Sequence, residues 1–74
     1  MNKDVIKAIK HKMIDEDLTM LGLARKYNLS YSQLNAAMNK RKGFGFKAQT
    51  QLCKFIPELT EKDFEEHNNS LKLV

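Results

Sequence analysis

Apolar side chains recur at intervals of three and four residues along most of the chain, the spacing that places them on one face of an α-helix. In residues 3–16, Val5, Ile6 and Ile9 begin such a stripe, and the lysines of this segment lie elsewhere around it. Comparable stripes predict further helices over 20–27, 31–39, 47–56 and from Thr60 to about 66 or 67. The pattern predicts an all-α protein, a compact five-helix bundle.

Capping residues define the second and third helices more sharply than the apolar pattern does. Thr19 precedes one apolar run and Ser30 precedes the next, and both are strong N-cap residues. Gln33 stands three residues after Ser30, as a capping box requires. Asn28 lies between the runs and tolerates the left-handed conformation that ends many helices. Residues 19–39 therefore predict a helix, a tight turn and a second helix, which together form a helix-turn-helix.

Other signals mark the remaining helix ends and the domain limits. Asn2 is a plausible cap for the first helix, Gly43 is the expected left-handed residue after the third, and Pro57 stops the fourth. We expect one domain over residues 1–67. The remaining residues, 68–74, would form a tail that is either frayed or an arm in a dimer.

The segment from Leu23 to Leu34 resembles the core motif of the phage repressor/Cro (Xre-like) family of DNA-binding domains. Ala24 matches the small residue at which the two helices approach closely, the turn is Asn28-Leu29-Ser30, and Leu34 matches the apolar position in the second helix. The resemblance implies a lambda-repressor-like bundle over about 3–67. It also implies a transcriptional regulator of a temperate-phage lysis/lysogeny switch that acts in the cytoplasm of a bacterial host.

Charge is unevenly distributed along the chain. Residues 1–54 hold 11 Lys and Arg against 4 Asp and Glu, a net +7, whereas residues 55–74 carry a net −3 from 2 Lys and 5 acids. A basic body with an acidic end suits a surface that binds a polyanion such as double-stranded DNA. No apolar run approaches the roughly 18–20 residues of a membrane span, so we expect no membrane association.

The resemblance and the positions of the polar residues together suggest how DNA would be bound. The second helix of such a motif enters the major groove with its N-terminus first, so its early outward residues reach the base edges. These are Tyr31, Ser32, Gln33 and Asn35. Candidate phosphate contacts are Lys26, Ser30, Asn39, Lys40, Arg41, Lys42 and Lys47.

A second function stays open because Ala36 and Ala37 leave little chemistry on the reading helix. Some switch proteins of temperate phages act as antirepressors or modulators that bind a cognate repressor protein. The DNA-reading face of a repressor is basic, so acids would be expected at the contact. Candidate partner contacts are Asp15, Glu16, Asp17, Ala36, Glu61, Glu65 and Glu66.

Two aromatic residues and the end of the chain are candidates for contacts between two copies. Phe44 and Phe46 flank Gly45 and could be core residues, dimer contacts or wedges against a base. Leu71, Leu73 and Val74 alternate in the predicted tail and would form the arm of a homodimer.

Catalytic and metal chemistry finds little support in the sequence. His11 and His67 lie far apart with no metal-ligand spacing around them, and the single cysteine, Cys53, falls in an apolar-periodic segment typical of a buried thiol. We expect no enzyme, no metal ion and no cofactor.

Overall fold

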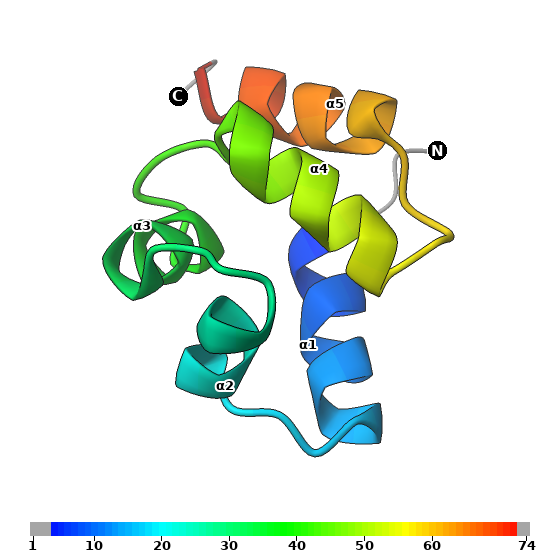
Figure 1. The fold of residues 1–74 in the computed structure, drawn as a ribbon. Coiled ribbons are helices and arrows are strands. Elements are labelled where there is room, and N and C mark those ends of the chain that lie inside the picture. Colours follow the sequence, from blue (N-terminus) through cyan, green and yellow to red (C-terminus); the bar gives the residue numbers. More distant parts are fainter. Residues whose placement is uncertain (1–3, 73–74) are drawn as a thin grey trace.

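The computed structural model describes residues 4–72, with Lys72 by its backbone alone, and these residues form five α-helices and no strand (Figure 1). The helices are α1 (Val5–Asp15), α2 (Met20–Lys26), α3 (Tyr31–Met38), α4 (Phe46–Phe55) and α5 (Glu61–Lys72). The prediction of an all-α five-helix bundle is confirmed. None of these helices is long and apolar enough to cross a membrane.

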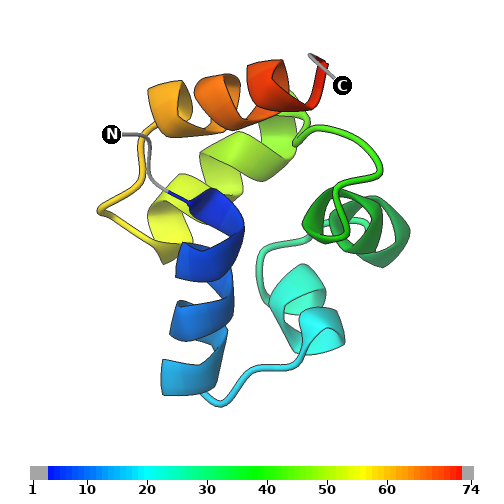
Figure 2. The same ribbon diagram turned by 180° about the vertical axis from the view of Figure 1, so that it is seen from behind.

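The helices pack as two groups around one core. α2 packs against α3 on one side of the molecule, and α5 lies across one end, where it contacts both α4 and α1 (Figures 1 and 2). The fully buried side chains come from α2 in the first group and from α1, α4 and α5 in the second, so both groups share one core. The largest of them are Phe64, Ile9, Leu23, Leu52 and Val5. Burial of each such side chain stabilises the fold by about 1.5–3 kcal/mol.

Side-chain caps begin α2 and α3 as the sequence predicts. Thr19 Oγ1 accepts a hydrogen bond of 3.0 Å from the Gly22 N–H. Ser30 Oγ accepts one of 3.4 Å from the Gln33 N–H. Each cap satisfies one of the backbone donors that have no partner inside the helix, so the start of both helices is fixed by local chemistry.

The cap of α1 differs from the expectation, whereas α5 begins with Thr60 as the sequence predicts. Asp4, not Asn2, begins α1, and its Oδ1 accepts a 3.0 Å bond from the Lys7 N–H; Asn2 lies outside the described residues. At α5 the Thr60 N–H donates to Asp63 Oδ2 at 2.9 Å, and the Asp63 N–H donates to Thr60 Oγ1 at 3.4 Å. This reciprocal pair is a capping box in which Asp takes the usual place of Glu.

Left-handed residues end the first three helices. Within the described chain the non-glycine residues with positive φ are Asp17 at 54°, Asn28 at 55° and Lys40 at 61°. The N–H of the residue after each bonds to the carbonyl five residues earlier at 2.7–2.9 Å, as in a Schellman motif. The expectation for Asn28 is confirmed, whereas Gly43 is not the left-handed residue after α3, because Lys40 is.

α5 extends beyond its predicted end near residue 67. The helix continues to Lys72, so residues 68–72 of the predicted tail belong to it, and 73–74 lie outside the described residues. Asn68 explains part of this difference, because it hydrogen-bonds to the backbone of Phe44 in the loop between α3 and α4. That contact is tertiary and leaves no local signal in Asn68-Asn69-Ser70, which are poor helix formers.

Glycine at position 43 is required by close packing. A Cβ added to Gly43 would lie 2.7 Å from Cγ and Oδ1 of Asn68, whereas a Cβ on Gly45 would have no neighbour within 4 Å. We therefore expect Gly43→Ala to displace Asn68, break its bonds to Phe44 and lower the free energy of unfolding by about 1–3 kcal/mol. Denaturant unfolding measures this change.

Gly45→Ala is the matched control. Alanine is a poorer N-cap than glycine but restricts the unfolded chain, and these effects offset to within about 0.5 kcal/mol. Equal stabilities of the two alanine variants would contradict the role given to Gly43.

Candidate nucleic-acid interface

The first turn of α3 presents a cluster of exposed polar side chains. Tyr31 is 46% exposed, and Ser32 and Gln33 are exposed beside it. They share this turn because Leu34, Ala37 and Met38 of the same helix face the core. A helix that buries one face against the body of the protein thus carries its hydrogen-bonding groups on the other.

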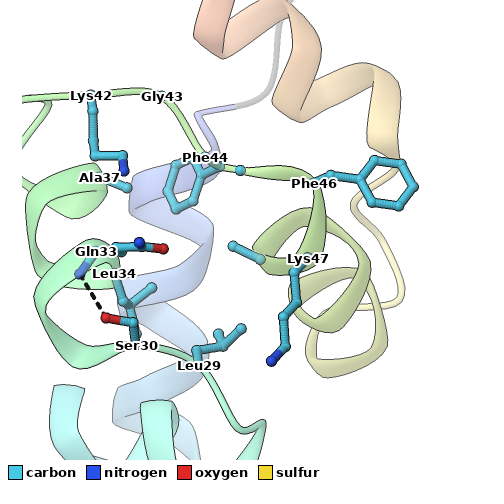
Figure 3. A pocket seen from close by; sticks show the side chains of 12 residues that line it. Leu29, Ser30, Gln33, Leu34, Ala37, Lys42, Gly43, Phe44, Phe46 and Lys47 are labelled. Atoms are coloured by element: carbon cyan, nitrogen blue, oxygen red, sulfur yellow. Dashed lines mark hydrogen bonds between the residues drawn. The ribbon is translucent and has the colours of Figure 1, made fainter.

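The side chain of Gln33 is not held by the capping box that the sequence predicts. Only the half of the box in which Ser30 accepts from the Gln33 N–H is present. Figure 3 shows the carboxamide of Gln33 pointing into a groove beside α3. Both the donor and the acceptor of this amide are therefore free to bind another molecule.

Asn35 lies in a different environment from the other three candidate base readers. It is half-buried, and its Oδ1 accepts a 3.1 Å bond from Asn39 Nδ2, which also bonds to the Asn35 carbonyl at 2.8 Å. These bonds tie the two carboxamides together along α3. The geometry therefore favours Gln33 over Asn35 as a group that hydrogen-bonds to another molecule. The bonds to Asn35 also occupy the Nδ2 donor that Asn39 would offer to a phosphate.

A groove of about 250 Å³ lies between α3, the loop after it and the start of α4 (Figure 3). Its lining combines apolar side chains with two lysines: Lys42 reaches toward Ala37, and Lys47 reaches toward Leu29. The remaining lining residues are Ser30, Gln33, Leu34, Gly43, Phe44, Gly45, Phe46 and Ala48. Cations above an apolar floor can hold an anionic group together with the carbon atoms attached to it.

Four of the candidate phosphate-binding cations lie in the loop after α3 or next to it; Lys42 and Lys47 line this groove, whereas Lys40 and Arg41 line a neighbouring cleft with Asn68 and Leu71. Lys40, Arg41, Lys42 and Lys47 are all exposed and lie between the end of α3 and the first turn of α4. Lys26 lies apart from them on α2. Its Nζ is 3.7 Å from Glu16 Oε1 and 5.9 Å from the centre of the Tyr27 ring. An exposed ion pair of this kind is worth about 0–1 kcal/mol, so Lys26 is only weakly held.

The acidic residues proposed as partner contacts lie at two places. Asp15, Glu16 and Asp17 are exposed at the corner between α1 and α2 (Figure 2). On α5, Glu61 and Glu65 are exposed and Glu66 is half-buried. Ala36 is half-buried on α3. The structure thus does not bring the candidate partner contacts into one surface.

Two exposed apolar residues stand before and after the acidic residues in the chain, and the first of them, Ile14, lines a groove with Lys10, His11 and Lys40. Ile14 is 77% exposed and Leu21 is 44% exposed. Neither residue was predicted as a site from the sequence, although Ile14 stands outside the apolar stripe of its helix and could be recognised by that.

The two phenylalanines around Gly45 have opposite environments. Phe44 is 3% exposed and packs edge-on against Phe64 with ring centres 5.2 Å apart, whereas Phe46 is 77% exposed. Phe44 is therefore a core residue, and its proposed role as a dimer contact is wrong. Phe46 remains available for one. Leu71 is half-buried, and Leu73 and Val74 lie outside the described residues.

Within the described residues, no three His, Cys, Asp or Glu side chains gather as metal ligands would. Burial, with smaller contributions from Glu61 and Asp63, raises the pKa of the half-buried Cys53 thiol. A thiol with a raised pKa is a weak nucleophile near neutral pH.

His67 is the unusual titratable group. Its Nε2 is buried without a hydrogen-bond partner, and its ring lies 5.4 Å from that of Phe44. Burial lowers the pKa of His67; the charge of Asp4 opposes this shift and that of Lys40 adds to it. The neutral imidazole is therefore the form that the folded protein favours.

Comparisons with known proteins do not identify this surface. No protein-family model, no curated protein and no solved structure matches the chain.

The lowered pKa of His67 predicts a dependence of stability on pH. As the pH falls below about 6.5, the unfolded chain takes up a proton at this position before the folded one does, so the free energy of unfolding decreases. We expect His67→Gln to flatten the unfolding free energy between about pH 7 and pH 5. Denaturant titrations at a series of pH values measure this.

His11→Gln serves as the control for this prediction, since His11 is an exposed histidine. A decrease in stability toward low pH that persists in His67→Gln and disappears in His11→Gln would contradict the assignment.

Proposed function

We propose that this protein is a small transcriptional regulator that binds double-stranded DNA through α2 and α3, with the N-terminus of α3 in the major groove. The observation that carries the proposal is the arrangement around the groove beside α3. Gln33, which shares the exposed first turn of α3 with Tyr31 and Ser32, lines this groove, and so do Lys42 and Lys47 of the basic segment 40–47. Groups that read bases and groups that neutralise phosphates are thus presented by adjacent elements.

The size and chemistry of α3 suit the major groove of B-DNA. An α-helix with its side chains is about 10–12 Å in diameter, and the major groove is about 12 Å wide. The free carboxamide of Gln33 matches the donor and acceptor edge of adenine, and such a pair contributes about 1–3 kcal/mol of discrimination. No Arg or Lys lies in α3 to bind guanine. Sites that contain A·T pairs are therefore the expected targets.

Phosphate contacts supply most of the affinity in this proposal. If Lys40, Arg41, Lys42 and Lys47 each neutralise one phosphate, the logarithm of the binding constant falls with the logarithm of the salt concentration with a slope of about −3 to −4. The resemblance of residues 23–34 to the phage repressor/Cro family agrees with this mode of binding. On the same ground we propose that the protein acts in the cytoplasm, in a genetic switch of a temperate phage.

A homodimer would double the number of contacts by presenting two copies of α3 to adjacent half-sites. Of the predicted dimer contacts within the described residues, Phe46 is the most exposed, at 77%.

Removal of two loop cations tests the DNA proposal. Arg41→Ala/Lys42→Ala should weaken binding to a random-sequence duplex and reduce the salt slope by about 1.8, because two phosphate contacts are lost. Lys40 is left in place because its left-handed backbone would mix stability with affinity. Fluorescence anisotropy at several salt concentrations measures both quantities.

Lys54→Ala/Lys62→Ala is the matched control, because it removes the same charge from two exposed lysines at the end of α4 and the start of α5. It should change the affinity much less. Equal losses in the two double variants would show general charge attraction only. A wild-type protein that does not bind DNA at low salt would contradict the proposal.

A second function, regulation through a repressor protein, is favoured by the acidic corner. Asp15, Glu16 and Asp17 are exposed there, and their charge is suited to a basic partner surface; the exposed Ile14 and Leu21 lie before and after them in the chain. In that case Ile14→Ser/Leu21→Ser would abolish binding to the repressor and leave DNA affinity unchanged. The DNA proposal alone predicts no effect of this variant on regulation.

A further inference from the structure

The basic segment 40–47 includes two residues whose backbones are not held by hydrogen bonds to the described residues. After the bonds that end α3, the backbones of Lys42 and Gly43 form no hydrogen bond with any described residue. A cleft of about 390 Å³ separates this segment from α5, with Lys40, Arg41 and Lys42 on one side and Leu71 on the other. A loop in which two residues lack backbone hydrogen bonds would sample many positions. A contact across the cleft therefore determines where the cations of this loop lie.

Asn68 makes that contact with both ends of its carboxamide. Its Oδ1 accepts a 2.8 Å bond from the Phe44 N–H, and its Nδ2 donates a 2.9 Å bond to the Phe44 carbonyl. The two residues are 24 positions apart in the chain. Gln49 Nε2 donates a further 2.9 Å bond to the same carbonyl. Phe44 is thus the residue at which the loop is fixed.

Packing around Phe44 makes this attachment directional. Its ring lies between Phe64 and His67 of α5, with centres 5.2 and 5.4 Å away. The backbone at Gly43 approaches Asn68 so closely that a Cβ there would lie 2.7 Å from the carboxamide. The ring holds the loop against the core, and the paired hydrogen bonds fix the rotation of its backbone.

We infer that Asn68 is a positioning residue for DNA binding: by clamping the backbone of Phe44, it holds the basic segment 40–47 in the place where its cations face the phosphates. The binding part of this inference rests on the proposed function. A loop that is ordered before binding loses less conformational entropy when the complex forms, so the clamp raises affinity without touching DNA.

The experiment compares Asn68→Ala with Asn69→Ala, which removes the same group from the exposed neighbouring position. Amide hydrogen exchange by NMR reports on the clamp, and anisotropy with a random-sequence duplex reports on binding. In Asn68→Ala we expect exchange at the Phe44 amide to become about tenfold faster or more. We also expect affinity to fall about threefold or more. One phosphate contact changes the affinity by about this factor when the salt concentration changes fourfold. Asn69→Ala should match the wild type in both.

A background without the loop cations separates positioning from general stability. If Asn68 acts through the basic segment, Asn68→Ala should weaken binding less in the Arg41→Ala/Lys42→Ala protein, which keeps only Lys40 and Lys47 of the segment's cations, than in the wild type. Asn68→Asp keeps the acceptor for the Phe44 N–H, so the Phe44 amide should remain protected even if the alanine variant does not fold.

Several outcomes overturn the inference. One is a Phe44 amide that exchanges in the wild type as fast as the neighbouring loop amides. Another is a folded Asn68→Ala protein with a lower melting temperature but unchanged affinity and salt slope, which would make Asn68 a stabilising residue only. If the wild type shows the clamp by hydrogen exchange but binds no duplex, the proposed function fails and the anchoring of the loop stands.

Discussion

The structure depends on the left-handed residues that end its first three helices. α1, α2 and α3 have 11, 7 and 8 residues, too few for stable helices in isolation, so each must join a shared core. Asp17, Asn28 and Lys40 reverse the chain within one residue and let the next segment return to that core. Left-handed geometry costs about 1–2 kcal/mol in a residue with a side chain, and burial of residues such as Ile9 and Leu23 offsets it. Short helices can then be packed tightly with short loops.

The arrangement of the candidate site follows from these short helices and short loops. Leu34 anchors α3 in the core, which leaves the first turn of α3 facing outward with Gln33 free of the cap. The loop after α3 is anchored by Phe44, a core residue supplied by a loop and not by a helix. Exposed lysines on either side of a buried anchor can be held in place without being buried themselves. The polar first turn of α3 and the basic loop thereby become parts of one surface. Asn68 of α5 holds the loop in place through its hydrogen bonds to the backbone of Phe44.

What the sequence could predict was the chemistry that acts over a few residues. Thr19, Ser30 and Asn28 have strong local preferences, and the structure uses all three as expected. Lysine has no such preference for left-handed geometry, so the sequence does not mark Lys40 and instead favours Gly43 as the left-handed residue after α3. Gly43 instead serves a contact with Asn68, which depends on a residue distant in sequence. The same limit applies to Phe44 and Phe46, because no local pattern shows that one is buried and the other exposed. It also applies to the last turns of α5, which depend on the tertiary contact of Asn68. Whether the outward side chains of α3 read bases depends on a partner and has no signature in the fold.

The measurement that tests the account most directly is an NMR titration of the ¹⁵N-labelled protein with a short A·T-containing duplex. The account predicts that the amides of residues 30–33 and 40–47 shift together, that the shifts weaken as salt is added, and that the amides of Ile14–Asp17 and Leu21 stay unchanged. Shifts confined to the acidic corner, or none at low salt, would contradict DNA binding by α3 and direct attention to a protein partner.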